Sequence, residues 1–399
     1  MMVALDTTNY VLSTEASHLK RSTIRELLAH AVDPQMISLA GGLPAGEFLP
    51  LEAYRECLNT VMKRDGAPSM QYGPQYMPLR EWLADYMQQR GVRCTPEQIY
   101  ITNGNQNGLA ILSRLFLNPG DTAAIEEITF TGIKLVTSGR GMIISPFKTS
   151  HQSGADMDAM EAVFAGEPRP RLAVLIPDFH NPLGVCLSLE QRQRAAHLAG
   201  KYHIPLIEDD PYSPLRFSGE QLPPIKAFDE AGFVFYLGSF SKMMAPALRM
   251  GWMVVPEALG AKIAGLRESF DLESSALTQR AVHEFLARGY LPPHLEQLNA
   301  VNQERAQALL DALEAHFSGV ATWTHPEGGL FIWLELPPHI NTWDLLPEAL
   351  EHKVVYIPGG AFSVNGGANN TMRLNFSNVT PQKIAQGVER LAKAVKRHL

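Results

Sequence analysis

The sequence predicts an α/β protein with a large domain on a mostly parallel sheet and a smaller α+β domain. Short apolar runs alternate with helical periodicity from Ile99 to about Val255. After about residue 290 this alternation gives way to a long helical pattern followed by strands. Alternating strands and helices are typical of a parallel sheet between helical layers. A chain of 399 residues also exceeds what one hydrophobic core comfortably holds.

Short apolar segments bounded by Gly, Pro, Asn or Asp are interpreted as the strands of the large sheet. They are Ile99–Thr102, Thr122–Ile125, Leu172–Ile176, Leu206–Asp209, Phe233–Leu237 and Gly251–Val255. Several are apolar throughout, as expected for strands covered on both faces.

Helix boundaries are marked by their terminal residues. Ser188 followed by Gln191 indicates a capping box that opens a helix running to about Gly200. An apolar stripe from Leu79 to Met87 predicts a core-facing helix closed by Gly91.

The C-terminal region predicts a different arrangement. We expect a long helix ending near Phe317, strands at Leu330–Leu334 and Thr371–Phe376, and a helix from about Pro381. The predicted division is an N-terminal segment over the site (1–45), a large domain (46–295) and a small domain (296–399).

Composition excludes several classes of protein. The balance of 34 basic against 41 acidic residues gives a net charge of −7, and no basic run offers a surface for nucleic acid. Three widely spaced cysteines argue against a disulfide framework or zinc site and favour a reducing cytoplasm. No apolar stretch is long enough to predict a membrane span, and no signal peptide is indicated.

A lysine at a predicted strand end is the first candidate for chemistry. The tetrapeptide Ser239 to Lys242 follows an apolar strand, and Arg249 lies seven residues further on. Ligands bind at strand ends in α/β sheets, and an amine among hydroxyls and a guanidinium could form a Schiff base with a phosphorylated carbonyl compound. The alternative is a solvated lysine in a polar loop.

Two further strand ends carry polar residues. The segment from Asn103 to Gly108 opens a helix whose first N–H groups could bind an anion, although the same residues also favour a plain turn. The carboxylates of Glu208 to Asp210 could bind a metal, cap a strand end or hold a pyridinium nitrogen. No His or Cys cluster accompanies them, so we predict no metal.

Two more polar residues interrupt otherwise apolar surroundings. Asn181 precedes a proline in a predicted turn, where its amide could donate to a ring oxygen. Arg373 lies inside an apolar strand, where a buried guanidinium needs a partner. That partner is either a ligand carboxylate or an internal Asp or Glu.

Taken together, these segments resemble the fold type I pyridoxal-phosphate aminotransferases of class I/II over almost the whole chain. The most specific motifs are Gln71 to Pro74, Asn181 to Gly184, Asp209 to Tyr212, Ser239 to Lys242 with Arg249, and Arg373. Two stretches, Ser38 to Pro44 and Tyr236 to Lys242, are similar to the branch of 2-aminoadipate and kynurenine aminotransferases. The resemblance implies a seven-stranded sheet and pyridoxal 5'-phosphate as cofactor.

The resemblance also implies the roles of the central residues. Lys242 would hold the cofactor covalently and then move the proton between substrate and cofactor. Asp209 would keep the pyridine nitrogen protonated, and Tyr212 and Asn181 would hydrogen-bond the ring's phenolic oxygen. Arg373 would take the substrate's α-carboxylate bidentately, with Asn181 beside it.

Further cofactor contacts follow from the same resemblance. Phe130 would stack on the pyridine ring in place of the Tyr common in this branch. Asn105 replaces a small hydroxyl residue, which puts one phosphate contact in doubt. The groups implied for the phosphate are the backbone amides of Asn105 and Gln106 and the side chains of Ser239, Ser241 and Arg249.

Three residues outside these motifs complete the expected site. Tyr72 would reach the phosphate of a neighbouring subunit's cofactor, which implies a homodimer. Gly42, in the loop from Gly41 to Phe48, would line the substrate pocket. Arg25, in the N-terminal segment, would contact an acidic substrate side chain or lie on the surface beside Glu26.

The predicted function is therefore an aminotransferase acting on an L-amino acid and a 2-oxo acid. We expect glutamate and 2-oxoglutarate as one pair, and 2-aminoadipate, an aromatic or a branched-chain amino acid as the other donor. Another reaction on the same fold, such as C–S β-elimination or decarboxylation, is the alternative. A regulatory protein is less favoured because few residues precede Gly41 and the charge is acidic. A cofactor-free interaction protein would not need all of these segments.

Overall fold

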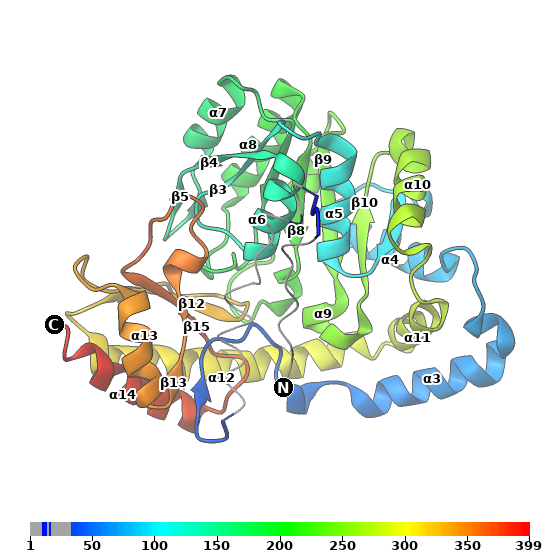
Figure 1. The fold of residues 1–399 in the computed structure, drawn as a ribbon. Coiled ribbons are helices and arrows are strands. Elements are labelled where there is room, and N and C mark those ends of the chain that lie inside the picture. The colour runs from blue at the N-terminus through cyan, green and yellow to red at the C-terminus, as the bar shows by residue number, and fades with distance from the viewer. Residues whose placement is uncertain (1–9, 14–15, 17–32) are drawn as a thin grey trace.

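The large sheet organises the molecule (Figure 1). The computed structural model describes residues 10–13, 16 and 33–399. The sheet has 7 strands in the order β2-β10-β9-β8-β7-β3-β4, and β10 alone is antiparallel to its neighbours. The strands are β2 (Ile99–Thr102), β3 (Thr122–Glu126), β4 (Ile143–Phe147), β7 (Leu172–Leu175), β8 (Leu206–Asp210), β9 (Val234–Ser239) and β10 (Gly251–Val254). The predicted mostly parallel sheet is confirmed.

The predicted strand segments all lie in this sheet, with ends shifted by at most two residues. The strand that sequence reasoning missed is β4, at the edge of the sheet. Ser145 and Pro146 interrupt its apolar run, and most of its residues are only partly buried or exposed. An edge strand covered on fewer sides has no continuous apolar signature, so its pattern is weak.

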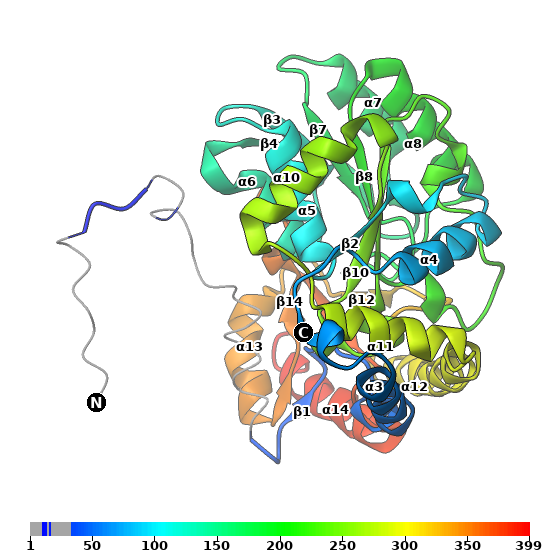
Figure 2. The same ribbon diagram turned by 90° about the vertical axis from the view of Figure 1, so that its right-hand side faces the viewer.

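Helices cover both faces of the sheet. Figure 2 views the sheet close to edge-on, with α5, α6 and α10 on one side and α4 and α8 on the other. Successive strand residues point to opposite faces, so Ile207 and Phe235 pack with α5 while Leu206 and Val234 pack with α8. The bounds are α4 (Met77–Gln89), α5 (Asn105–Phe116), α6 (Thr131–Ser138), α7 (Met157–Ala165), α8 (Leu189–Tyr202) and α10 (Gly260–Asp271).

The predicted helix ends are confirmed at the residues that signal them. Ser188 and Gln191 form the reciprocal capping box that opens α8. Gly91 follows α4 with φ of 86°, a left-handed conformation that glycine adopts without strain. No helix within the described residues is long and apolar enough to cross a membrane.

The small domain is built on an antiparallel sheet in the order β11-β12-β15-β14. Its elements are β11 (Thr322–Trp323), β12 (Phe331–Glu335), α13 (Thr342–Glu351), β14 (Ile357–Pro358), β15 (Thr371–Asn375) and α14 (Pro381–Val395). Near the N-terminus, β1 (Ile37–Ser38) pairs in parallel with β13 (Val354–Val355). The first described segment after residue 33 is therefore anchored on this domain.

One long helix, α12 (Leu291–Phe317), belongs to both parts of the molecule. Leu298 packs in the core of the large sheet, whereas Leu309 and Leu313 pack in the core of the small domain. The expected boundary between residues 295 and 296 falls inside this helix. The remaining helices of the large part are α3 (Leu51–Asp65) and α11 (Ala276–Ala287), which contact each other.

Candidate active site

The end of strand β9 positions the candidate lysine. Lys242 lies in the single-turn helix α9 (Phe240–Met243), which starts directly after β9. Ser239 caps this turn, because its hydroxyl accepts a hydrogen bond from the Ser241 N–H at 3.1 Å. The neighbouring strand β8 places Asp209 in register with Leu237. Lys242 and Asp209 therefore lie at the same carboxyl-end edge of the sheet, where α/β proteins bind ligands.

The amine of Lys242 has no carboxylate partner among the described residues. Its Nζ donates to the main-chain oxygen of Gly42 at 2.6 Å. Burial, together with the positive charges of Arg373 and Arg249, lowers the pKa of Lys242 to about 8. A lysine with a lowered pKa supplies neutral amine near physiological pH, which is the form that attacks a carbonyl.

Asp209 is buried and accepts a single side-chain hydrogen bond. The Nδ2 of Asn105 donates to its Oδ1 at 2.7 Å, and among the described residues its Oδ2 has no hydrogen-bond partner. The pKa of Asp209 is raised to about 7, and burial is the main cause. The Asn105 hydrogen bond opposes this rise, and the charge of Asp210 adds to it. A cationic N–H placed at Oδ2 would supply the missing counter-charge.

A chain of hydrogen bonds joins the strand end to the small domain. Asn181 donates from Nδ2 to the Tyr212 hydroxyl at 3.1 Å, and Arg373 donates from Nη1 to Asn181 Oδ1 at 2.7 Å. All three side chains are buried. Burial raises the pKa of Tyr212, so its hydroxyl stays protonated and available as a donor. These residues, predicted from separate motifs, lie together.

Arg373 is a buried guanidinium without an internal carboxylate. Besides the bond to Asn181, its Nη2 donates to Ala40 O at 2.7 Å, and its buried Nε has no partner. The guanidinium carbon lies 4.2 Å from the centre of the Phe331 ring. No Asp or Glu of the described part of the chain forms an ion pair with it, and burial lowers its pKa to about 10. The internal salt bridge considered from the sequence is absent there, so the fork is open to a ligand carboxylate.

The start of helix α5 has the geometry of an anion site. Gly104 precedes the helix with φ of 82°, and a Cβ there would lie 2.8 Å from Nη2 of Arg249. The left-handed φ favours glycine here, and the guanidinium lies beside the free N–H groups of the first turn, which include those of Asn105 and Gln106. Arg249 itself is exposed and donates to Asn103 O at 2.9 Å.

Phe130 lies at the start of helix α6, beside the same edge. A Cβ on Gly132 would meet both the Phe130 ring and Gln106 Oε1 at 2.3 Å, so Phe130 and Gln106 approach the same glycine. Gln106 also donates to Gly132 O at 3.1 Å. The ring is partly buried, which leaves surface for contact with a ligand. A stacking role for Phe130 stays a prediction.

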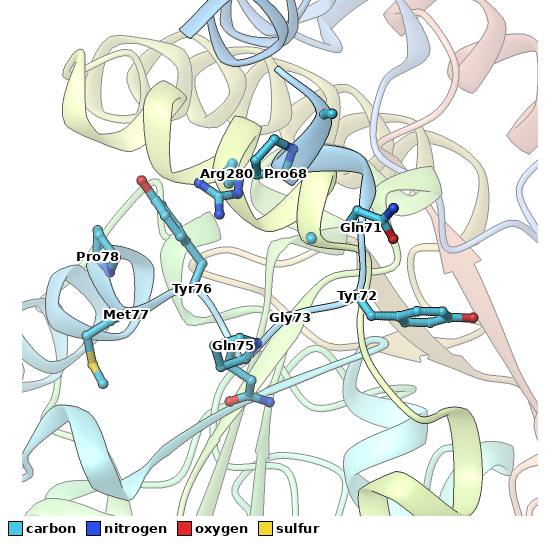
Figure 3. A pocket seen from close by; sticks show the side chains of 12 residues that line it. Pro68, Gln71, Tyr72, Gly73, Gln75, Tyr76, Met77, Pro78 and Arg280 are labelled. Carbon is cyan, nitrogen blue, oxygen red and sulfur yellow. The ribbon is translucent and has the colours of Figure 1, made fainter. Parts of the chain in front are cut away.

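Tyr72 lies apart from these residues. Its side chain is 82% exposed and projects from the loop that precedes α4 (Figure 3). A pocket of about 690 Å³ lies along this loop. It is lined by Ala67, Pro68, Gln71, Tyr72, Gly73, Pro74, Gln75, Tyr76, Met77, Pro78, Ala276 and Arg280. None of these is a residue placed above at the edge of the sheet, and Arg25 lies outside the described residues.

The loop that carries Tyr72 is held firmly. Glu273 accepts from the Gly73 N–H at 2.9 Å, and Gln279 accepts from the Tyr76 N–H at 2.9 Å. Gln75 exchanges two hydrogen bonds of 3.0 Å with the main chain of Ile101. An exposed tyrosine on a fixed loop is typical of a contact with another molecule.

Sequence reasoning missed three features of the site. The side chain of Asn105 contacts Asp209, although only its backbone amide was expected to act. The main-chain oxygens of Gly42 and Ala40 bind Lys242 and Arg373, and carbonyl groups leave no trace in sequence. The signal that could have indicated Asn105 was its place at the first position of a helix that follows a strand of the same sheet.

The fold and the edge of the sheet define a class of enzyme, one that holds an aldehyde cofactor on a lysine at a strand end. Residues 34–391 match the family described as aminotransferase class I and II. The chain belongs to this family, whose members depend on pyridoxal 5'-phosphate, and it is an aminotransferase.

Comparison with individual relatives shows which branch of the aminotransferase family this chain resembles. The chain is 38% identical to a 2-aminoadipate transaminase of Thermus thermophilus, covering 96% of this chain and 95% of the relative. It is 35% identical to aromatic-amino-acid aminotransferase 1 of Thermococcus litoralis, covering 97% and 94%. The crystal structure of Pyrococcus horikoshii kynurenine aminotransferase superimposes with a TM-score of 0.92 at 34% identity, covering 97% of each chain. The branch predicted from the sequence is confirmed.

Proposed function

We propose that this aminotransferase exchanges an amino group between an L-amino acid and a 2-oxo acid, with glutamate and 2-oxoglutarate as one pair. The second donor is 2-aminoadipate, an aromatic or a branched-chain amino acid, in line with the names of the relatives. The proposal rests on the buried guanidinium of Arg373, which has no carboxylate partner in the part of the chain that the structure describes. Every amino acid and 2-oxo acid carries the carboxylate that it would bind.

The described residues fit the cofactor of the family. Among the residues that the structure describes, the amine of Lys242 has no carboxylate partner and Oδ2 of Asp209 is open to a ring N–H. Tyr212 and Asn181 would hydrogen-bond the ring's phenolic oxygen, and Phe130 would cover the ring. The phosphate would be held by the α5 N-terminus at Asn105 and Gln106 with Ser239, Ser241 and Arg249.

Each residue then has a defined task in the reaction. Arg373 orients the substrate through its carboxylate, which fixes the direction of the Cα–H bond. Lys242, as a free amine, would move the proton from the donor Cα to the cofactor. In the second half of the exchange it would return a proton to Cα of the former oxo acid. Asp209 keeps the ring nitrogen protonated by its negative charge. When bound, the cofactor supplies the electron sink for the bond that breaks.

We also propose a division of labour between the two domains. Residues 46–295 would carry the cofactor contacts, while residues 296–399 would bring Arg373 to the substrate. Gly42 lies between them, because its oxygen binds Lys242 while Ser377 of the small domain donates to Leu43 O at 2.6 Å. The loop from Gly41 to Phe48 would therefore line the substrate pocket, and Arg25 stays a candidate for an acidic side chain. A cytoplasmic location stays a prediction that rests on the cysteines.

We propose that two copies of the chain form the working unit, with Tyr72 completing the partner's phosphate site. Large apolar side chains of α3 and the following loop are exposed, among them Leu51 at 69%, Met62 at 53% and Met70 at 67%. Exposed apolar side chains along α3 and on the segment that leads to Tyr72 fit an interface between subunits. Within one chain, Tyr72 makes no hydrogen bond to Lys242 or Asp209.

Mixing two inactive variants tests the shared site. Tyr72→Ala and Lys242→Ala should each lose activity alone. Co-expressed, they form mixed dimers with one complete site, because Lys242 comes from one subunit and Tyr72 from the other. We expect recovery of about a quarter of the wild-type activity for random pairing. No recovery despite mixed dimers seen by mass spectrometry would contradict a shared site.

A panel of amino donors, with one variant of Lys242 and one control variant, tests the reaction. We expect kcat/KM with 2-oxoglutarate to be measurable for glutamate, 2-aminoadipate, leucine or phenylalanine, and the new amino acid to match the oxo acid consumed. Lys242→Ala should lose at least about 10³-fold in rate together with the visible absorbance of bound cofactor. Lys226→Ala is a matched control, because Lys226 pairs with Asp229. Release of ammonia or carbon dioxide instead would favour elimination or decarboxylation.

A further inference from the structure

Asn105 is placed unusually for the first residue of a helix. Its side chain turns into the molecule, and its Nδ2 reaches Asp209 Oδ1 at 2.7 Å and Leu237 O at 3.4 Å. Gly104 occupies the N-cap position, and no side chain caps this helix. The Asn105 side chain therefore does not cap the start of α5. The amide instead links the start of α5 to the ends of β8 and β9.

The orientation of the amide fixes what it does to the carboxylate. Two acceptors, Asp209 Oδ1 and Leu237 O, face the nitrogen end of Asn105. The oxygen end is buried without a partner, 3.1 Å from where a Cβ of Gly251 would lie. The reverse orientation would place three oxygens together. Asn105 therefore donates to Asp209, and a donor stabilises the charged carboxylate over the neutral acid.

Asp209 needs such a donor because its other surroundings oppose the charge. Burial raises its pKa, and the neighbouring charge of Asp210 acts in the same direction. The Asn105 bond is the one side-chain hydrogen bond to Asp209 within the described residues. It also occupies Oδ1, which leaves Oδ2 as the oxygen that can meet a ring nitrogen.

We propose that Asn105 is a positioning residue that holds Oδ1 of Asp209 and keeps its Oδ2 ionised and directed at the ring nitrogen of the cofactor. The inference rests on the proposed role of Asp209. It assigns to the Asn105 side chain a task separate from phosphate binding by the backbone amide of the same residue. Losing the side chain should therefore weaken the ring-nitrogen contact specifically.

The test compares two cofactors in four proteins. Apoprotein is titrated with pyridoxal 5'-phosphate and with its 1-deaza analogue, in which carbon replaces the ring nitrogen, and both dissociation constants are measured by protein fluorescence. The proteins are the wild type, Asn105→Ala, Asn105→Ser and Asn107→Ala. Asn107 is the matched control because it lies in the same helical turn but donates to Asp271 at 3.3 Å.

We expect the wild type to prefer the cofactor that carries the ring nitrogen. In Asn105→Ala this preference should fall by about ten-fold or more, the effect of one hydrogen bond to a charged group. Asn105→Ser should behave alike, because its side chain is too short to reach Asp209. Asn107→Ala should keep the wild-type preference even if both cofactors bind more weakly.

The other outcomes separate the two ideas. If Asn105→Ala and Asn105→Ser weaken both cofactors equally, the residue acts only on the helix start or the phosphate, and the inference is wrong. If the wild type itself binds both cofactors equally, the proposed role of Asp209 is wrong. The serine variant keeps the test decisive should the alanine variant fail to fold.

Discussion

Asp209 and Asp210 are neighbours at the end of β8, yet they face opposite sides of the sheet. Asp210 accepts from the Ser213 N–H and hydroxyl, from the Tyr236 hydroxyl at 2.8 Å and from Arg90 at 3.0 Å. Burial alone would raise its pKa, but Arg90 and Ser213 hold the pKa below its usual value. Asp209 has one donor and a pKa raised to about 7.

Two buried arginines repeat this contrast. Arg192 makes two hydrogen bonds to Asp178, at 2.8 and 2.9 Å, and both side chains are fully buried. Within residues 33–399, Arg373 has no such carboxylate, and its buried Nε has no hydrogen-bond partner. Asp210 and Arg192 are satisfied by the fold, whereas Asp209 and Arg373 are left for a ligand. Incomplete pairing of these two buried charges, next to the strand end that carries Lys242, is what a binding site for a charged ligand requires.

The largest effect expected from this contrast concerns the two aspartates. Asp209→Asn should lower kcat by at least about 10³-fold, about 4 kcal/mol of barrier, while the stability of the apoprotein holds. Asp210→Asn should cost about 3 kcal/mol of unfolding free energy, because Arg90 loses its charged partner. Steady-state kinetics and urea unfolding check both. Equal loss of stability in the two variants would contradict the distinction between a functional Asp209 and a structural Asp210.

Substitution of the two arginines should likewise affect stability in one case and substrate binding in the other. The expected effect on function is smaller than for Asp209. Arg192→Met should reduce the unfolding free energy by about 3 kcal/mol, since Asp178 stays buried with only Arg216 at 3.7 Å. Arg373→Met should change it by less than about 1 kcal/mol, because the removed charge was itself costly to bury. Its KM for the amino donor should rise by about 30-fold or more. An unchanged KM in that variant would contradict carboxylate binding.

The smallest effect, counted per pH unit, is the dependence of the apoprotein's unfolding free energy on pH. The pKa of Lys242 is about 8 in the folded chain, below the ordinary lysine value of 10.5, so the unfolded chain binds more protons between these values. Stability from this residue therefore rises with pH from about 8 to 10.5, by at most about 1.4 kcal/mol per pH unit. Lys242→Met should lack this rise. The measurement is urea unfolding of both apoproteins from pH 7 to 10, and a constant difference between them would argue against a buried amine.

The sequence predicted most of the architecture for identifiable reasons. Strands covered on both faces are apolar throughout, so β7 (Leu172–Leu175) was found, while β4 at the edge was not. Capping residues such as Ser188 act over a few positions and are readable locally. The site residues were predicted through motifs, and the structure places Asp209, Lys242 and Arg373 at one edge.

What sequence could not provide was the pairing of neighbours. Which of Asp209 and Asp210 faces the site depends on strand register, and a one-residue shift would exchange them. The donor from Asn105 and the carbonyl of Gly42 depend on contacts between distant segments. Such contacts are properties of the folded chain and are not encoded in any short motif.

The register of β8 with β9 has a consequence for substitutions elsewhere in the chain. Asp209 on β8 lies opposite Leu237 on β9, and β9 leads directly to Lys242. The spacing between Asp209 and the start of the Lys242 turn is therefore set by the backbone geometry of two paired strands. The segment around Gly42 and the strand carrying Arg373 lie outside that pair of strands. Substitutions in the outer segments can therefore alter the contacts to a substrate while the spacing between Asp209 and Lys242 is retained.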